Sequence, residues 1–436
     1  MGIAELNPVC ASKGFGSEIS DWLERLDPLA VTTSNAGCLE VPFQRWMKFK
    51  EAFSPKFVID AISSLPSRPN LCVDPFGGSG TTALTCSILG IDAVTIEVNP
   101  FLHDLIAAKL CRYDLCEVAS AIEAVIDRAN DISVDISTSL DGAPRTMCEP
   151  GLNGRWIFNE DVCARILALR TAFDCLKSPE IRRLFKVLLG GKLVELSNVV
   201  INGKGRRYRG GWQARRLSAI DVDKAWLSAV NSAVSDIALI GDSRRGRALV
   251  VHGDSRKEIE KLSNIDYALF SPPYPNSFDY TDVYNIELWM LGYLTDSDSN
   301  RHLRKQTLRS HVQTSFDWST GISSSQSLVE VLAKLQTADK LWDRRLPEMV
   351  AAYFDDMHKI LCNLSAALRP GGHLTAVVGD SQYSGVLIRT DVIMAEIAAH
   401  LGYTLTHSEP VRVMRSSAQH GGAHELNETA LTLRFG

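Results

Sequence analysis

The chain has 436 residues with 45% hydrophobic and 22% charged residues, values ordinary for a globular protein that is longer than one compact core usually covers. Its net charge of −5 excludes a protein coated in basic charge but leaves room for a local basic face. There is no apolar run that could span a bilayer and no secretory leader, so we expect a cytoplasmic protein without membrane contact. Ten cysteines are scattered without a C-x-x-C pair or zinc spacing, which predicts free thiols and no metal site.

The first forty residues have weak periodicity, and we interpret 1–40 as a leader that precedes the main fold. A helix is expected to begin at Ser54-Pro55, because serine is a preferred cap and proline is tolerated in the first helical turn.

Residues 71–97 read as a strand, a loop, a helix and a second strand. The first strand ends at Asp74, the loop Pro75–Thr82 is rich in glycine, and the second strand ends at Glu97. Glycines let the backbone approach a ligand closely, and the helix N-terminus presents free N–H groups. An acid at the end of the second strand is placed to accept hydrogen bonds from ribose hydroxyls. This segment therefore predicts a nucleotide-binding βαβ unit, and Asn99-Pro100 opens the helix after it.

Residues 131–240 are predicted to form an inserted, mainly helical segment. It contains a stretch, 203–216, with six basic residues, two aromatic residues, four glycines and no acid. Arginines match phosphates bidentately and aromatic rings stack on bases, so we favour nucleic-acid contact over a merely solvated charged surface. The candidate contacts are Lys204, Arg206, Arg207, Tyr208, Arg209, Trp212, Arg215 and Arg216.

The alternation of strands and helices resumes at residue 248, and a strand ending at Phe270 runs into Ser271-Pro272-Pro273-Tyr274. Two prolines cannot continue a central strand, since they lack N–H donors and have fixed φ. Their carbonyl oxygens and the serine hydroxyl can accept hydrogen bonds from an amino group while the tyrosine ring stacks on the planar molecule that bears it. The alternative is an ordinary strand end followed by a surface tyrosine.

Farther along, Asp279-Tyr280 is a candidate for shaping a pocket, with an exposed polar loop as the alternative. The polar residues 294–325 are predicted to be a loop or lid outside the core. About seven strands alternate with helices, which predicts an α/β, doubly wound, mostly parallel seven-stranded sheet. In such a sheet the first and fourth strands are neighbours, so the glycine loop and Ser271–Tyr274 should meet at one edge.

Four motifs in this order resemble those of the amino-group DNA methyltransferases: Asp74–Gly80, Glu97 with Asn99-Pro100, Gly253–Ser255 and Ser271–Tyr274. The resemblance implies a Rossmann-like methyltransferase domain formed by 41–130 and 241–436, with 131–240 resembling a target-recognition insertion. It also implies S-adenosylmethionine as cofactor and DNA as partner, with a restriction endonuclease as a possible separate companion.

Carried over by motif, the resemblance implies two groups of site residues. Those expected to hold the cofactor are Phe53, Ser54, Asp74, Pro75, Phe76, Gly77, Gly78, Gly80, Thr81, Glu97, Asn99, Asp254 and Ser255. Within that set, Glu97 would bind the ribose and Asp254 the adenine amino group. Those expected to hold and activate the target amine are Ser271, Pro272, Pro273 and Tyr274.

Two acceptors gripping an exocyclic amine favour a pyramidal nitrogen whose localised lone pair can attack a sulfonium methyl, with positioning as the main catalytic effect. A base in a duplex has to be extruded to reach such a pocket. The leading serine resembles enzymes that methylate N4 of cytosine, whereas the basic insertion ahead of Ser271 is more typical of enzymes that methylate N6 of adenine.

Four other functions stay open. RNA methylation would use the same chemistry, and basic loops do not separate RNA from DNA. Methylation of a protein glutamine normally shows asparagine before the two prolines. A non-catalytic nucleic-acid-binding relative would not need Asp74, Glu97 and Asp254. A nicotinamide dehydrogenase would need a G-x-G-x-x-G loop, which this chain only approximates.

Overall fold

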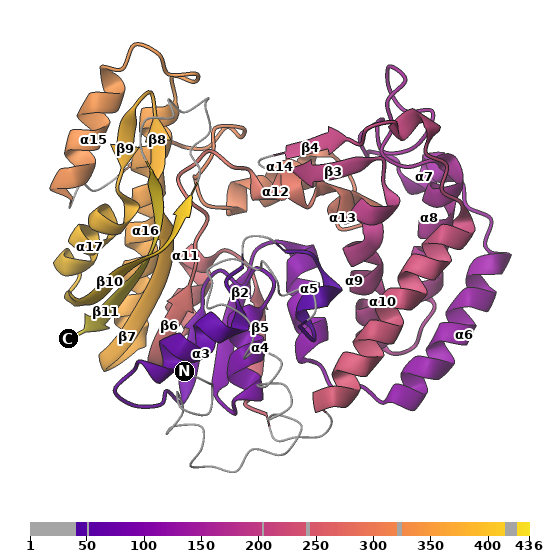
Figure 1. Ribbon diagram of the computed structural model, residues 1–436, viewed down its shortest axis with the longest axis horizontal. Helices are drawn as coiled ribbons and strands as arrows, with labels where there is room; N and C mark the ends of the chain where they lie inside the picture. Colours follow the sequence, from indigo (N-terminus) through magenta and orange to yellow (C-terminus); the bar gives the residue numbers. More distant parts are fainter. Residues whose placement is uncertain (1–40, 50–51, 203–204, 241–244, 321–324, 415–424) are drawn as a thin grey trace.

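The computed structural model describes residues 41–49, 52–202, 205–240, 245–320, 325–414 and 425–436 (Figure 1). The predicted leader, 1–40, and the candidate contact Lys204 lie outside the described residues. Across the described ranges, we find no helix that is both long and apolar enough to cross a lipid bilayer.

A seven-stranded sheet in the order β10-β11-β7-β6-β1-β2-β5 forms the centre of the molecule. Its strands are β1 (Leu71–Asp74), β2 (Asp92–Glu97), β5 (Ala248–His252), β6 (Ile265–Phe270), β7 (Leu368–Gly379), β10 (Tyr403–Met414) and β11 (Leu426–Phe435). The pairings from β5 to β7 are parallel, and β11 runs antiparallel between β7 and β10. The predicted α/β fold with a mostly parallel seven-stranded sheet is confirmed, including the pairing of the first and fourth strands.

Both faces of this sheet are covered. On β6, Tyr267 and Leu269 belong to an apolar cluster with the helices α3 (Pro55–Ser63), α4 (Thr81–Ile88) and α5 (Pro100–Leu110). Ala268 and Phe270, on the alternate positions, belong to a second cluster with α16 (Leu346–Ala367) and α17 (Thr390–His400). A strand buried on both faces needs apolar side chains at every position, which explains the continuous apolar run before Ser271.

The insertion is a helical bundle that stands beside the sheet (Figure 1). Its helices are α6 (Leu115–Asp131), α7 (Ile136–Ser139), α8 (Glu160–Asp174), α9 (Pro179–Leu196) and α10 (Ala219–Ile240). The rings of Phe173, Phe185 and Trp226 pack against one another inside it. Helix α9 packs on α5, which ties the bundle to the sheet, and α6 packs on α8, so the bundle begins before residue 131.

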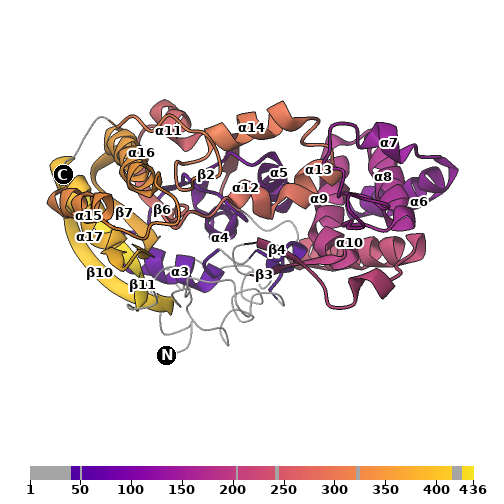
Figure 2. The same ribbon diagram turned by 90° about the horizontal axis from the view of Figure 1, so that it is seen from above.

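The basic stretch after α9 is more regular than its glycines indicate. A two-stranded antiparallel hairpin forms there from β3 (Val199–Asn202) and β4 (Gly205–Tyr208), followed by the 3-10 turn η3 (Trp212–Ala214). Strand β3 contacts α9 of the bundle, and β4 contacts α12 (Tyr280–Val283), as the view from above also shows (Figure 2).

The expectation that 294–325 is a loop or lid outside the core is wrong for Leu303 and for most of 308–314, which are buried, while 321–324 lie outside the described residues. The segment contains α14 (Ser297–Gln306), and Arg309 and His311 after it are buried. The guanidinium of Arg309 can be buried because it pairs with Asp355 at 2.6 Å and with Asp356 at 2.8 Å, both on α16. The remaining elements are η2 (Gln44–Trp46), α11 (Ser255–Glu258), η4 (Ile259–Lys261), α12 (Tyr280–Val283), α13 (Asn285–Met290), α15 (Gln326–Gln336), β8 (Ser381–Tyr383) and β9 (Val386–Ile388).

Candidate active site

A cavity of about 390 Å³ opens where the carboxyl ends of β1, β2 and β6 meet. Residues from every predicted motif line it: Phe53, Asp74, Pro75, Phe76, Gly77, Gly78, Thr81, Glu97, Asn99, Asp254, Ser255, Ser271, Pro272, Pro273 and Tyr274. Two predicted residues support the cavity without lining it. Ser54 caps α3 by accepting a hydrogen bond from the Phe57 N–H, and Gly80 precedes α4 with a left-handed φ of 81°.

The glycine loop has to consist of glycines for steric reasons. A Cβ at Gly77 would lie 2.5 Å from Thr95 Oγ1, far closer than side chains tolerate. Gly78 has a φ of +52°, a conformation that other residues adopt only at a cost. The loop therefore runs close against β2 and presents its backbone to the cavity.

Glu97 anchors this loop from the end of β2. One carboxylate oxygen accepts from the Gly78 N–H at 2.7 Å, and the other accepts from the Asn99 N–H at 2.8 Å. Burial raises the pKa of Glu97 to about 7 and the pKa of neighbouring Asp74 to about 6. Two buried carboxyl groups thus titrate near neutral pH in one cavity, a pattern typical of functional sites.

Lys109 supports the loop from below and was missed by sequence reasoning. It is fully buried on α5, and its Nζ donates to the Ser79 carbonyl oxygen at 2.7 Å. Burial lowers its pKa to about 7. A lysine inside an apolar helix carries no local signal of a partner thirty residues earlier in the chain.

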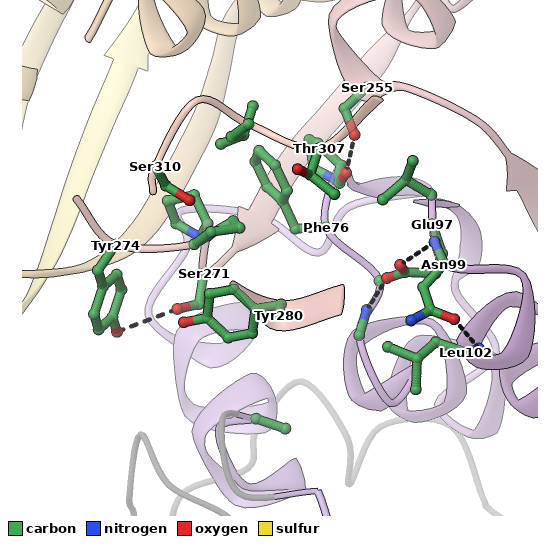
Figure 3. Close-up of a pocket in the computed structure, with 18 of the residues that line it drawn as sticks. Phe76, Glu97, Asn99, Leu102, Ser255, Ser271, Tyr274, Tyr280, Thr307 and Ser310 are labelled. Carbon is green, nitrogen blue, oxygen red and sulfur yellow. Dashed lines mark hydrogen bonds between the residues drawn. The ribbon is translucent and has the colours of Figure 1, made fainter. Parts of the chain in front are cut away.

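The Gly253–Ser255 turn closes the cavity behind the glycine loop. Ser255 donates from its hydroxyl to the Pro75 carbonyl oxygen, which ties the two loops together (Figure 3). Asp254 caps α11 and forms an ion pair with Arg256 at 2.8 Å. Arg256 in turn pairs with Asp356 on α16 at 2.9 Å, so the carboxylate of Asp254 is held in one orientation.

Ser271 and Tyr274 lie across the cavity from Glu97, with their hydroxyls toward each other at 3.3 Å (Figure 3). Ser271 also donates to the Val377 carbonyl oxygen at 3.0 Å. The ring of Tyr274 packs on Gly379, where a Cβ would lie 2.5 Å from the ring. Tyr274 therefore forms part of the cavity wall. The alternative interpretation, in which Tyr274 is an ordinary surface residue, is wrong.

Several residues that line the cavity were not identified from the sequence. Besides Phe49 and Tyr284, whose rings stack at 5.6 Å, they include His311, Arg412 and Glu428. Burial lowers the pKa of His311, so its imidazole is neutral at pH 7. Of the Asp279-Tyr280 pair, Tyr280 lines the cavity near Ser271 (Figure 3). Asp279 does not line the cavity; it is buried and caps α12.

The basic candidates of the insertion have several different partners. Arg206 pairs with Asp282 on α12 at 3.2 Å, while Arg209 and Arg215 donate to carbonyl oxygens at the end of α9. Trp212 is buried, and its ring packs against those of Trp156 and Tyr208. The side chains of Arg207 and Arg216 are exposed, although Arg216 donates to two carbonyl oxygens nearby.

Comparison with known proteins gives the chain clear relatives, although no protein-family model matches it. Type II methyltransferase M.BsoBI of Geobacillus stearothermophilus is 24% identical over 440 residues, covering 87% of this chain and 81% of that protein. Type II methyltransferase M.AvaI of Anabaena variabilis is 25% identical over 429 residues, covering 88% and 84%. The chain is similar to Type II methyltransferases.

A third relative, Type II methyltransferase M.MjaII of Methanocaldococcus jannaschii, is 26% identical over 88 residues, or 20% of this chain. The two longer matches extend beyond the motif-bearing segments, since a match over 87% of the chain has to include much of the helical insertion. The likeness to methyltransferases thus concerns the bundle as well as the sheet.

Proposed function

We propose that the chain is an S-adenosylmethionine-dependent DNA methyltransferase that methylates the N4 amine of cytosine in an extruded base. One observation carries the proposal: β1 and β6 are adjacent, so the glycine loop and Ser271–Tyr274 line the same cavity. The relatives named Type II methyltransferases support methyl transfer.

The glycine-loop half of the cavity fits the proposed cofactor. Each oxygen of Glu97 accepts one backbone N–H and has a second lone pair, so the carboxylate can accept one ribose hydroxyl on each oxygen. Gly78 keeps the space between the loop and the cavity-lining ring of Phe49 open, because a Cβ there would lie 3.2 Å from that ring. When bound there, S-adenosylmethionine would supply a sulfonium methyl group, and Asp254 would hold the adenine amino group.

The other half fits a planar base that bears an amine. Ser271 Oγ and the Pro272 carbonyl oxygen are the two proposed acceptors for its hydrogens, and the cavity beside them is walled by the rings of Tyr274 and Tyr280. Cytosine is favoured over adenine by the serine ahead of the two prolines. DNA is the proposed partner because Arg207 is exposed on β4, a strand that contacts the cavity-lining helix α12. A separately acting endonuclease is a possible companion.

The test is to incubate the protein with duplex DNA and tritiated S-adenosylmethionine, then to digest the DNA and separate its nucleosides. We expect label in N4-methylcytosine. Label only in N6-methyladenine would contradict the cytosine assignment, and labelling of RNA but not DNA would contradict the choice of DNA. Replacing Ser271–Tyr274 by alanines should abolish labelling while cofactor binding persists.

A further inference from the structure

Glu428 is a carboxylate on β11 that lies beside the proposed amine site, far from every motif in sequence. It is 2% exposed, and one of its oxygens accepts from the Tyr274 hydroxyl at 2.6 Å. The same oxygen accepts from Arg412 at 3.1 Å. Since β11 pairs Glu428 with Gly379, against which the Tyr274 ring packs, the sheet itself fixes this carboxylate next to the ring.

A continuous path of oxygens leads from the amine site to Glu428. The Ser271 oxygen lies 3.3 Å from the Tyr274 oxygen, which lies 2.6 Å from Glu428. A hydroxyl oxygen has one proton and two lone pairs, so Ser271 can turn its proton from the Val377 carbonyl to Tyr274 and still accept from an amine. Burial and the adjacent carboxylate raise the pKa of Tyr274, which keeps the phenol protonated and able to donate.

Resting on the function proposed above, we propose that Glu428 is the terminal proton acceptor of the reaction and acts on the target amine through Tyr274 and Ser271. Aligned hydroxyl donors polarise one another toward the carboxylate, which strengthens Ser271 as an acceptor. Glu428 and Tyr274 therefore act in part as positioning residues, and Ser271 touches the substrate.

The methyl group moves from a sulfonium sulfur to the target nitrogen. The amine lone pair forms the new C–N bond, the C–S bond breaks, and its electron pair stays on sulfur as a neutral thioether. The nitrogen then carries one surplus proton, which Ser271 accepts as its own proton passes to Tyr274 and the phenolic proton passes to Glu428. The neutral carboxyl afterwards releases that proton to water beside Arg412, whose side chain is 42% exposed.

The test compares single-turnover rates of wild type, Glu428→Gln, Tyr274→Phe and the double variant on the nucleic acid that wild type methylates. Glutamine keeps the size and one acceptor oxygen of Glu428, and phenylalanine keeps the ring of Tyr274. We expect each single variant to lose about 10²-fold in rate, the range typical of a lost proton acceptor, with unchanged KM values. Because the two groups form one path, the double variant should be no slower than the slower single variant.

Two further measurements separate this role from a structural one. Wild type should show a solvent deuterium isotope effect on the single-turnover rate that both variants reduce. Binding of DNA containing 2-aminopurine, followed by fluorescence without cofactor, should be unchanged in Glu428→Gln. Glu409→Gln is the matched control, because Glu409 is an exposed acid of the neighbouring strand β10 and pairs with His407.

The outcomes are distinct. Wild-type rates in Glu428→Gln, or additive losses in the double variant, would overturn the relay while leaving the methyltransferase assignment intact. A wild-type protein that labels no nucleic acid would overturn both.

Discussion

Glu97 shows how one buried side chain can make a binding site sensitive to pH. Its pKa is raised to about 7 by burial, and its hydrogen bonds with backbone N–H groups favour the charged form without outweighing that effect. In the proposed cofactor site, ribose hydroxyls would donate to the carboxylate, so binding would favour the deprotonated form. Affinity for an adenosyl ligand should therefore rise with pH through the neutral range.

We predict that S-adenosylhomocysteine binds wild type more weakly at pH 6 than at pH 8, measured by titration calorimetry. Glu97→Gln should bind this ligand at least about tenfold more weakly at pH 8. A neutral amide is a weaker acceptor than a carboxylate, and its NH₂ group would face one of the two backbone N–H groups that donate to Glu97. The variant should also lose most of the difference between the two pH values.

Glu123→Gln is the control for this experiment, because Glu123 is exposed on α6, away from the cavity. Titration of the ligand's own amino group affects all three proteins equally. Equal pH dependence in wild type and Glu97→Gln would contradict the role of Glu97.

At the scale of elements, the hairpin β3–β4 and the turn after it combine two kinds of arginine. Arg209 bridges the end of α9, donating to the carbonyl oxygens of Val194 at 2.8 Å and Ser197 at 3.1 Å. Arg207 faces solvent on β4. The arginines of this basic stretch look alike in the sequence, but some of them stabilise the fold and others are exposed.

We predict that Arg207→Ala weakens DNA binding and reduces the slope of log affinity against log salt by about one, as loss of one phosphate contact requires. Arg209→Ala should instead destabilise the protein by about 1–3 kcal/mol, because two helix-end carbonyls lose a charged donor. Fluorescence anisotropy over a salt series and urea unfolding would measure the two effects. A salt slope unchanged in Arg207→Ala would contradict the contact.

These elements also show what the sequence could and could not reveal. The start of α3 at Ser54-Pro55 was predictable, since its capping serine and its proline are local properties. The hairpin was not, because glycines have low strand propensity and nothing local shows that β4 contacts α12, far along the chain. The burial of Arg309 depends on Asp355 and Asp356, which no local pattern links to it.

The residues of the candidate site likewise differ in whether the sequence reveals them. Cavity residues that belong to short motifs, such as Glu97 and Ser271, were identified because one ends a strand and the other directly follows one. Lys109 and Glu428 were not, because each meets its partner only through the fold: α5 lies under the glycine loop, and β11 lies beside β7.

Over the whole molecule, buried titratable groups make stability depend on pH. Burial raises the pKa of Asp74 to about 6, of Glu97 to about 7 and of Glu287, which is fully buried on α13, to about 8. Above their ordinary values of 3.8 to 4.5, the unfolded chain loses these protons while the folded protein keeps them. Through these three groups the free energy of unfolding should fall as pH rises from about 4 to 8. His311, His358 and His373, whose pKa values burial lowers, act in the opposite direction. Lys109, with its lowered pKa of about 7, does so above pH 7.

We predict that Glu287→Gln removes one of these contributions. Wild type should lose stability between pH 5.5 and 8, with Glu287 contributing up to about 1.4 kcal/mol per pH unit, and the variant should lose less. Urea unfolding at both pH values measures the difference, again with Glu123→Gln as the control. A variant whose stability falls with pH as steeply as that of wild type would rule out a buried, protonated Glu287.

The antiparallel strand β11 has a consequence for how the protein is made. It lies between β7 and β10, both of which leave the ribosome before it. During synthesis β10 has no strand to pair with until β11 has been made. The edge of the sheet formed by β11 and β10 therefore assembles in one late step. The same event delivers Glu428 to the cavity wall. A nascent chain thus has its glycine loop long before it has a finished pocket, and methyl transfer would begin only when this part of folding is complete.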